Sequence, residues 1–444
     1  TMRLVQMCLC LALSLSLAAP SDIAEKPDND GHKHELHYGA KVERCAGMEF
    51  DAVAVNEEGI PYFFKGDHLF KGFHGEAELS NETFPELDEH HHLGHVDAAF
   101  RMHSEDSPDH HDHQFFFLDS KVFSYYKHKL EKDYPKNIFE VFPGIPDHLD
   151  AAVECPKPDC TNDTVIFFKG IIGYCGICFY RHRLKHDGNV ISIMPNCTGA
   201  FRYMDHYYCF HGHQFSKFDP VTGEVQGKYP KETRDYFMRC PHFGKKSTDE
   251  HIEREQCSRV HLDAITSDDD GSVYAFRGHH FLSITGDKFH SDTVESAFKE
   301  LHSEVDAVFS YEGHLYMIMD NEMFVYKVGE PHTHLEGYPK PLKEVLGIEG
   351  PVDAAFVCAD HHIAHVIKGQ TVYDVEMKAT PRAPAKEGSI TQFKKIDAAM
   401  CGPKGVTVVI GNHYYLYESP MAMMMARIMP EQHRVSQELF GCDH

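Results

Sequence analysis

The sequence has no tryptophan and comparatively little positive charge. Its 444 residues include 43 Lys and Arg against 68 Asp and Glu, which gives a formal net charge of −25 at pH 7. A surface this acidic argues against nucleic acid or anionic lipid as the main partner. No apolar run is long enough to span a bilayer comfortably, so we expect no membrane insertion.

Motifs of common enzymes are also missing. The chain has no P-loop, no dinucleotide-binding fingerprint and no nucleophile motif, and no HExxH or CxxC…H pattern fixes a zinc ion. We therefore expect that the protein is not an enzyme. Apolar residues make up 42% of the chain and charged residues 25%, the balance of an ordinary globular protein.

The N-terminal residues 1–19 have the pattern of a secretory signal peptide. Arg3 supplies the positive charge, Met7–Leu17 is apolar, and the small pair Ala18–Ala19 offers a cleavage site. The pattern predicts a secreted, extracellular protein.

Cysteines and glycosylation motifs agree with secretion. Of the 14 cysteines, Cys8 and Cys10 lie in the signal segment, and the even number that remains should pair in an oxidising compartment. Asn-X-Ser/Thr motifs predict glycosylation at Asn81, Asn162 and Asn196.

A short motif, VDAAF, stands at Val96–Phe100 and again at Val352–Phe356, and related copies recur along the chain. An apolar strand, a turn with Gly, Asp or Asn, and a second apolar strand follow each copy, as in YFFKGDHLF (Tyr62–Phe70), which is a hairpin pattern. A repeat of roughly 45 residues of short strands is the period of a β-propeller blade. The copies are at Asp51, Asp97, Asp150, a degenerate copy at Gly199, Asp263, Asp306, Asp353 and Asp397.

One interval between copies is longer than the others. It contains the polar stretch CPHFGKKSTDEHIEREQC (Cys240–Cys257), which has the features of a linker. The sequence therefore predicts an all-β fold of two four-bladed β-propellers joined by a short linker. The predicted boundaries are a signal peptide at 1–19, a flexible N-terminal segment at 20–44, a first propeller at 45–240, a linker at 241–256 and a second propeller at 257–444.

Several longer stretches carry a family resemblance. They are FPGIPDHLDAAVEC (Phe142–Cys155), YYCFHGHQFSKFDPVTGEV (Tyr207–Val225), RDYFMRCP (Arg234–Pro241), ITSDDDGSVYAF (Ile265–Phe276) and LFGCDH (Leu439–His444). Together with the two sets of four blades, they resemble hemopexin, the plasma haem-binding glycoprotein family, over nearly the whole mature chain. The lack of tryptophan and the histidine-rich insertions resemble its fish branch, the warm-temperature-acclimation proteins.

The resemblance implies a set of disulfides. The implied pairs are Cys45–Cys240, Cys257–Cys442, Cys155–Cys160, Cys197–Cys209 and Cys358–Cys401. Cys175 and Cys178 fall outside the family pattern, and they either pair with each other or stay reactive.

The resemblance also implies that haem b lies between the propellers with two axial histidines. One comes from a loop of the second propeller, where ITGDKFHSD (Ile284–Asp292) puts His290 in the ligand position. The other comes from the linker, where the position in register holds Lys245. His242 or His251 could take its place, or the linker ligand could be lost.

Three residues before the linker are further candidates for contact with haem. Arg234 could pair with a propionate, and Tyr236 and Tyr229 could stack on the porphyrin or donate to a propionate. Ordinary packing at the propeller rim is the alternative for all three.

Two histidine clusters are the remaining candidates for a metal site. EHHHLGH (Glu89–His95) and HSEDSPDHHDH (His103–His113) would chelate Zn, Cu or Ni weakly, or form a solvated acidic loop. By resemblance, the propeller channels would hold Ca, Na or chloride ions on carbonyl groups of the repeated strands.

Two functions follow from these features. The first is a monomeric haem scavenger of plasma that delivers haem to a cell-surface uptake receptor. The second is a secreted acclimation or acute-phase interaction protein that keeps the scaffold with weakened or lost haem binding. The linker distinguishes these two functions, because it has no histidine at the position in register with the family's axial ligand.

Overall fold

The structure is a computed structural model of the chain. It describes residues 44, 49–89, 95–103, 110–170, 172–175, 196–225, 227–238, 262–301, 304–359 and 361–442. All of them belong to one compact unit, Val42–His444. The described part is all-β, with eight antiparallel sheets and a few short helices.

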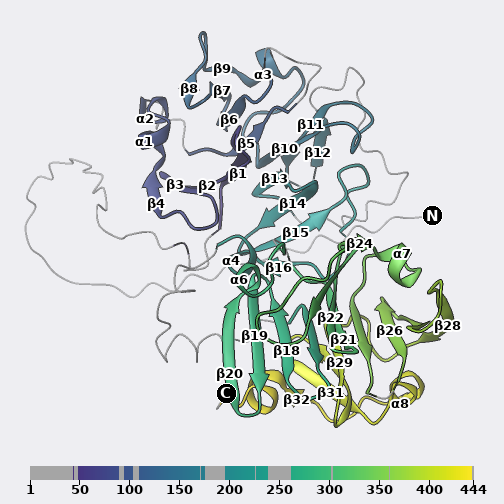
Figure 1. Cartoon of the computed structure of the whole chain (residues 1–444). Coiled ribbons are helices and arrows are strands. Elements are labelled where there is room, and N and C mark those ends of the chain that lie inside the picture. The colour runs from purple at the N-terminus through teal and green to yellow at the C-terminus, as the bar shows by residue number, and fades with distance from the viewer. Residues whose placement is uncertain are drawn as a thin grey trace, which may run out of the picture. The chain divides into compact units, whose positions relative to one another are not determined.

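Four sheets, which we call the first set, precede residue 239 (Figure 1). Their strands are β1 (Ala52–Val55), β2 (Pro61–Lys65), β3 (His68–Lys71) and β4 (Ala77–Leu79); β5 (Ala98–Arg101), β6 (Gln114–Leu118), β7 (Lys121–Tyr126), β8 (Lys129–Leu130) and β9 (Lys136–Asn137); β10 (Ala151–Cys155), β11 (Thr164–Lys169) and β12 (Ile172–Cys175); and β13 (Gly199–Tyr203), β14 (His206–His211), β15 (Gln214–Phe218) and β16 (Lys231–Glu232). Neighbours in each sheet are neighbours in the sequence, except that β9 pairs with β7.

Four more sheets, the second set, follow residue 261 in the same meander order. Their strands are β17 (Ala264–Ser267), β18 (Val273–Arg277), β19 (His280–Thr285) and β20 (Lys288–Thr293); β21 (Ala307–Tyr311), β22 (His314–Met319), β23 (Glu322–Lys327) and β24 (Lys340–Pro341); β25 (Ala354–Val357), β26 (Ile363–Lys368), β27 (Thr371–Glu376) and β28 (Pro384–Ser389); and β29 (Ala398–Gly402), β30 (Gly405–Ile410), β31 (His413–Tyr417) and β32 (His433–Arg434).

The repeated motif starts every sheet, as the sequence predicted, and its Asp side chain holds the turn of the following hairpin. In seven sheets one Asp oxygen accepts the backbone N–H of a turn residue whose φ lies between 53° and 59°. This left-handed conformation favours Gly or Asp at the turn. The pairs are Asp51 with Gly66, Asp97 with Asp119, Asp150 with Gly170, Asp263 with Gly278, Asp306 with Asp320, Asp353 with Gly369 and Asp397 with Gly411.

The sheets of each set pack against one another in a cycle. The first strands β1, β5, β10 and β13 contact each other in that order, and β13 contacts β1 again; β17, β21, β25 and β29 do the same. A separate hydrophobic cluster lies between each pair of neighbouring sheets. Thus the fourth sheet packs on the first through Phe210 and Phe63, and the eighth on the fifth through Val409 and Leu282.

Helices are short, and most of them lie beside the last strand of a sheet. They are α1 (Ser80–Thr83), α2 (Glu86–Glu89), α3 (Ile138–Val141), α4 (Thr233–Tyr236), α6 (Val294–Ala297), α7 (Leu342–Leu346), α8 (Pro420–Met425) and the π-helical turn η2 (Val435–Leu439). Within the described ranges, no helix is long and apolar enough to cross a membrane.

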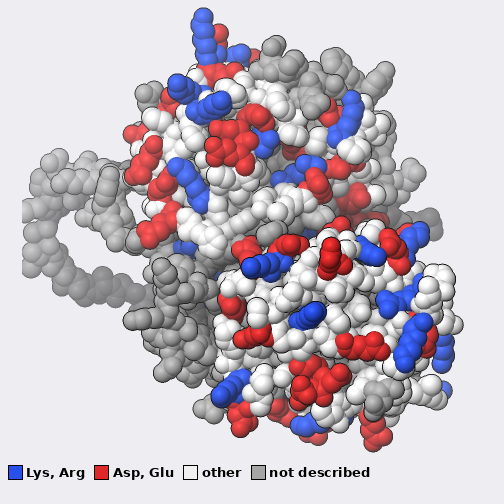
Figure 2. Space-filling model, viewed as in Figure 1, with Lys and Arg blue, Asp and Glu red and all other residues white. Residues whose placement is uncertain are grey.

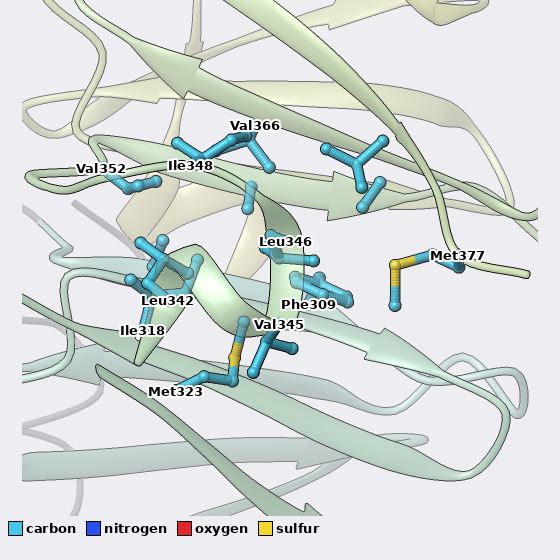
Figure 3. Packing of buried hydrophobic residues seen from close by; sticks show 14 of the residues in the cluster. Phe309, Ile318, Met323, Leu342, Val345, Leu346, Ile348, Val352, Val366 and Met377 are labelled. Carbon is cyan, nitrogen blue, oxygen red and sulfur yellow. The ribbon is translucent and has the colours of Figure 1, made fainter. Parts of the chain in front are cut away.

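The helix α7 shows how such a segment completes a core. Leu342, Val345 and Leu346 point into the space between the sixth and seventh sheets (Figure 3). There they meet Phe309 of β21 and Val366 of β26. Truncating one buried leucine of this kind to alanine costs about 2–5 kcal/mol, so the helix contributes directly to the contact between the sheets.

Three disulfides join the described cysteines in pairs that the family resemblance implied. They are Cys155–Cys160, Cys197–Cys209 and Cys358–Cys401. Cys442 is also disulfide-bonded, while its implied partner Cys257 and the implied pair Cys45–Cys240 lie outside the described residues. Cys175 ends β12, and Cys178 lies outside the described residues.

The surface agrees with the acidic composition. Figure 2 shows Asp and Glu side chains spread over the visible face, with Lys and Arg between them. The described part of this face therefore carries no broad basic patch of the kind that nucleic acid requires.

Candidate functional site

Residues 227–238 of the first set contact the second set, and Lys228 reaches the start of all four sheets there. Its ammonium group donates to the backbone carbonyl oxygen of Asp263 and lies 2.5, 2.9 and 2.7 Å from those of Asp306, Asp353 and Asp397. We call these four oxygens the carbonyl ring. Lys228 is only 3% exposed, and burial lowers its pKa. A cation of the first set thus stands where the four repeated strands of the second set begin.

Charged and hydroxyl groups surround this lysine. Tyr229 donates its hydroxyl hydrogen to Glu304, and Tyr236 donates to Asp263. The Lys231 ammonium lies 2.5 Å from Glu304 and 3.2 Å from Asp263. Two carboxylates of the second set are therefore satisfied by three side chains of the first.

The pKa values follow from this burial and pairing. Burial raises the pKa of Tyr229 and Tyr236 well above the usual range, and the carboxylates Glu304 and Asp263 raise it further. For Lys231, burial acts against the charge, but Asp263 and Glu304 outweigh it and raise the pKa. The network therefore holds one charged lysine between carboxylates and two neutral phenols at ordinary pH.

A second contact lies at the turn between β18 and β19. The backbone carbonyl of Asp235, in α4, accepts hydrogen bonds from the His279 backbone N–H (3.0 Å) and from His279 Nδ1. The approach is close, because a Cβ atom at Gly278 would lie 2.4 Å from this oxygen. His280 is buried beside it, with its Nε2 atom 3.5 Å from a carboxylate oxygen of Asp235.

A cavity of about 370 Å³ opens between the two sets. This volume is within the range of small-molecule and cofactor sites, roughly 300–1,000 Å³. Aromatic rings dominate its lining, with a few polar groups among them. The lining includes Phe73, Tyr203, Tyr208, Phe215, Tyr236, Phe237 and Phe324, together with His206, His279, Glu304 and Asp320.

One acidic residue of the lining, Asp320, is paired with two side chains. Asp320 lies 2.5 Å from the Lys217 ammonium and 2.9 Å from His206 Nε2. Burial would raise the pKa of Asp320, but these two partners outweigh burial and hold the pKa well below its usual range. The cavity therefore presents aromatic faces beside one carboxylate, Asp320, whose charge is balanced within the protein.

His290 lies in a strand rather than in the loop that the family resemblance implied. It is in β20, the last strand of the fifth sheet, opposite Ser283 of β19, and its side chain is exposed. Side chains alternate along a strand, and Phe289 packs beside Phe440. His290 consequently points away from that core, where an external ligand can reach it.

The other predicted residues divide into two groups. Tyr229 and Tyr236 use their hydroxyl groups within the protein, as described above, and Arg234 is half-buried in α4. His242 and His251, the two linker histidines, lie outside the described residues. Of the haem-contact candidates with described positions, only Tyr236 lines the cavity.

Sequence reasoning missed three residues of this region. His279 lines the cavity from the second set, and its signal was the pair His279–His280 in a hairpin turn. Lys228 and Glu304 carried no signal, because their roles depend on contacts across the two sets.

Comparison with known proteins identifies the family. The chain is 79% identical to "Hemopexin" of Danio rerio over 450 residues, which covers 100% of both chains. The chain belongs to the hemopexin family. "Hemopexin" of Homo sapiens is 33% identical over 96% of this chain and 94% of the human protein. The resemblance found in the sequence is therefore confirmed.

Two further comparisons add little to the hemopexin assignment. No model of a protein family matches the chain. A solved hemopexin-fold protein, CP4 from cow pea, is 15% identical with a TM-score of 0.35, over 40% of this chain and 94% of its own.

The aromatic cavity suits the ligand that gives the hemopexin family its name. Haem has a flat apolar face, which aromatic rings can contact, and its iron accepts imidazole ligands. Tyr208, Phe215 and Tyr236 offer such rings in the cavity, and exposed His290 offers an imidazole on the second set. The aromatic lining of the cavity therefore suits a flat apolar ligand such as haem, while His290 is not among the residues that line it.

Proposed function

We propose that this protein is a secreted haem-binding and transport protein of plasma. Full-length identity of 79% with a hemopexin carries the proposal, and the aromatic cavity between the two sets supports it. The acidic surface and the signal-like N-terminus agree with an extracellular carrier. The sites at Asn81, Asn162 and Asn196 would carry its glycans, and the last two of these asparagines are exposed.

The architecture that we propose is two four-bladed β-propellers. Cyclic contacts of the first strands and the clusters that join the fourth sheet to the first, and the eighth to the fifth, support this arrangement. In a propeller, the last blade packs on the first in this manner. Residues 241–256 would form the linker between the two rings.

Haem would be held between the propellers by one histidine from each side. His290 would ligate the iron from the second propeller, and His251 or His242 from the linker. Tyr236 would contact the porphyrin in the cavity, and Arg234 would act near the propionates, whereas the Tyr229 hydroxyl already donates to Glu304. Two imidazole ligands fill both axial positions of the iron, so the carrier would keep its cargo from reacting.

The remaining parts of the proposal concern partners. We infer a monomer without enzymatic activity that passes haem b to an uptake receptor on cells. Calcium, sodium or chloride ions would bind in the channel of the first propeller. In the second, Lys228 already contacts the carbonyl oxygens that such a cation would use.

Titration of the full-length protein with hemin tests the haem site. We expect one equivalent to give a sharp Soret band and a low-spin ferric spectrum. Losing an outer-shell partner alone costs a metal site about 10–100-fold in affinity, so His290→Ala should cost at least as much and remove the low-spin signal. Binding should weaken on acidification, because a protonated imidazole cannot ligate iron.

Separate His242→Ala and His251→Ala variants identify the linker ligand. His211→Ala, at an exposed strand histidine of the first set, is the matched control and should bind like the wild type. If both linker variants and their double variant keep the wild-type spectrum, the linker provides no ligand. If the wild type itself shows no Soret shift, the haem proposal fails and a secreted interaction protein on the same scaffold takes its place.

A further inference from the structure

Two histidines and a glutamate meet at the edge of the second sheet. His110 and His113 lie in the turn before β6, and Glu131 directly follows β8. His113 Nδ1 is 3.1 Å and His110 Nδ1 is 4.0 Å from the same oxygen, Oε2 of Glu131. All three ligand atoms lie within 4.8 Å of one another, which is close enough to share one metal ion.

The backbone fixes the positions of both histidines. The His113 N–H donates to the His110 carbonyl at 3.0 Å, and the Asp112 N–H donates to the Met102 carbonyl at 2.7 Å. Asp112 has a φ of 64°, which turns the chain back toward β6. The two imidazoles are thus held in a closed turn rather than in a free loop.

The glutamate is fixed by a different hairpin. Its backbone N–H donates to the Ser124 carbonyl at 2.9 Å, and the Ser124 hydroxyl donates to its Oε2 atom. Ser124 is fully buried in β7. A carboxylate oriented by a buried hydroxyl is the usual outer-shell arrangement of a metal ligand.

The Nδ1 atoms of both imidazoles lie near the carboxylate of Glu131, and they make no hydrogen bond to each other. Among the described residues, Nδ1 of His110 and Nδ1 of His113 are buried atoms that make no hydrogen bond. His113 as a whole is only 8% exposed. A single ion pair with Glu131 would account for one of these nitrogens, whereas a shared cation accounts for both.

We propose that His110, His113 and Glu131 form a zinc site. Two imidazole nitrogens, one carboxylate oxygen and an open fourth position for water are a common zinc ligand set. Ligands at zinc bond lengths in a tetrahedron lie about 3.4 Å apart, between the two distances to Glu131. Calcium and magnesium prefer all-oxygen sites, so the imidazoles select a borderline cation.

The zinc site is separate from the haem site. None of its three ligands lines the cavity between the two sets. Zinc would join the turn before β6 to the end of β8, two hairpins of one sheet. The protein would then bind a divalent cation independently of haem.

Zinc titration of the metal-free, full-length protein tests this site, with a chromophoric chelator as competitor. We expect the tightest site to weaken about tenfold or more in His110→Ala and in His113→Gln, and about 10–100-fold in Ser124→Ala. The His110 side chain is 45% exposed, so His110→Ala should fold normally even if the buried His113 variant does not.

The matched control is His103→Ala combined with His111→Ala. These residues form, with Asp112, the other group of possible metal ligands in the described chain, and this group contains no buried residue. The control should keep the tight zinc site. The proposal is overturned if His110→Ala binds zinc like the wild type, if the control loses the tight site, or if the wild type binds no zinc in competition with the chelator.

Discussion

At the residue scale, Glu154 is a carboxylic acid placed inside the first set. It lies in β10 and is 7% exposed, in the lining of a cavity of about 110 Å³ with Arg101 and Arg202. Burial raises its pKa to about 8, although the His103 N–H, 2.5 Å from its Oε1 atom, acts in the opposite direction. Glu154 is therefore mostly protonated in the folded protein at neutral pH.

This pKa predicts a pH dependence of stability. Between the ordinary glutamate pKa near 4.5 and the folded value of about 8, the folded state binds one proton more than the unfolded state. Glu154 therefore contributes its full amount to the free energy of unfolding below pH 4.5. This contribution is lost as the pH rises to about 8, by up to about 1.4 kcal/mol per pH unit.

Glu154→Gln should remove this dependence, because glutamine stays neutral. We expect the stability of the wild type relative to the variant, from urea unfolding, to fall between pH 5 and 8 and to level off above that. A difference that stays constant over this range would show that Glu154 is already ionised in the folded protein.

At the element scale, the repeated Asp-Ala-Ala unit explains why the sequence alone could predict the sheets. Each Asp and the turn N–H that it accepts are 14 to 22 residues apart, within one strand and the next hairpin. Such local units repeat visibly, so the number of sheets and their first strands follow from the sequence.

Non-local features could not be predicted in this way. Lys228 contacts the Asp397 carbonyl 169 residues away, and no local pattern marks it. The family resemblance implied a loop for His290, whereas Lys288–Thr293 forms a strand. The proposed zinc ligand Glu131 is closer in sequence to His110 and His113, but it belongs to no repeated pattern, so the histidine-rich stretch alone did not reveal it.

The turn contact itself predicts a cost for losing the carboxylate. Asp97→Ala would leave the Asp119 N–H, now 2.7 Å from Asp97 Oδ2, without its acceptor, at about 1–3 kcal/mol. Asp97→Asn keeps an acceptor oxygen and should cost less. In the fourth sheet the backbone pairing puts Thr198, one residue before Gly199, at the Asp position. The Thr198 hydroxyl contacts the Phe210 carbonyl only at 3.4 Å, so Thr198→Ala should cost little. Equal losses for Asp97→Ala and Thr198→Ala in denaturant unfolding would contradict this role.

At the scale of the whole molecule, one lysine links the two sets at the centre of the second. The carbonyl ring offers four oxygens, while the ammonium group of Lys228 has only three hydrogens to donate. Lys228 therefore stabilises the ring by its positive charge as well as by hydrogen bonds. The first set thus supplies the positive charge that these four oxygens face.

Lys228→Met should therefore lower stability in a way that a cation can restore. The variant leaves several buried carbonyl oxygens unsatisfied, which should cost about 3 kcal/mol or more. Calorimetry of the variant should show the second set unfolding at a lower temperature than the first. In the wild type, the two sets should unfold together in one transition.

Lys217→Met is the matched control, because Lys217 also joins the sets, 2.5 Å from Asp320, but does not touch the carbonyl ring. Adding calcium or sodium should raise the unfolding temperature of Lys228→Met, since a ligand that binds only the folded state stabilises it. The wild type and Lys217→Met should respond less, because their carbonyl ring already holds an ammonium and only the channel of the first set remains to bind a cation. If all three proteins respond alike, the cation acts elsewhere, and Lys228 is an ordinary contact rather than the cation of the second set.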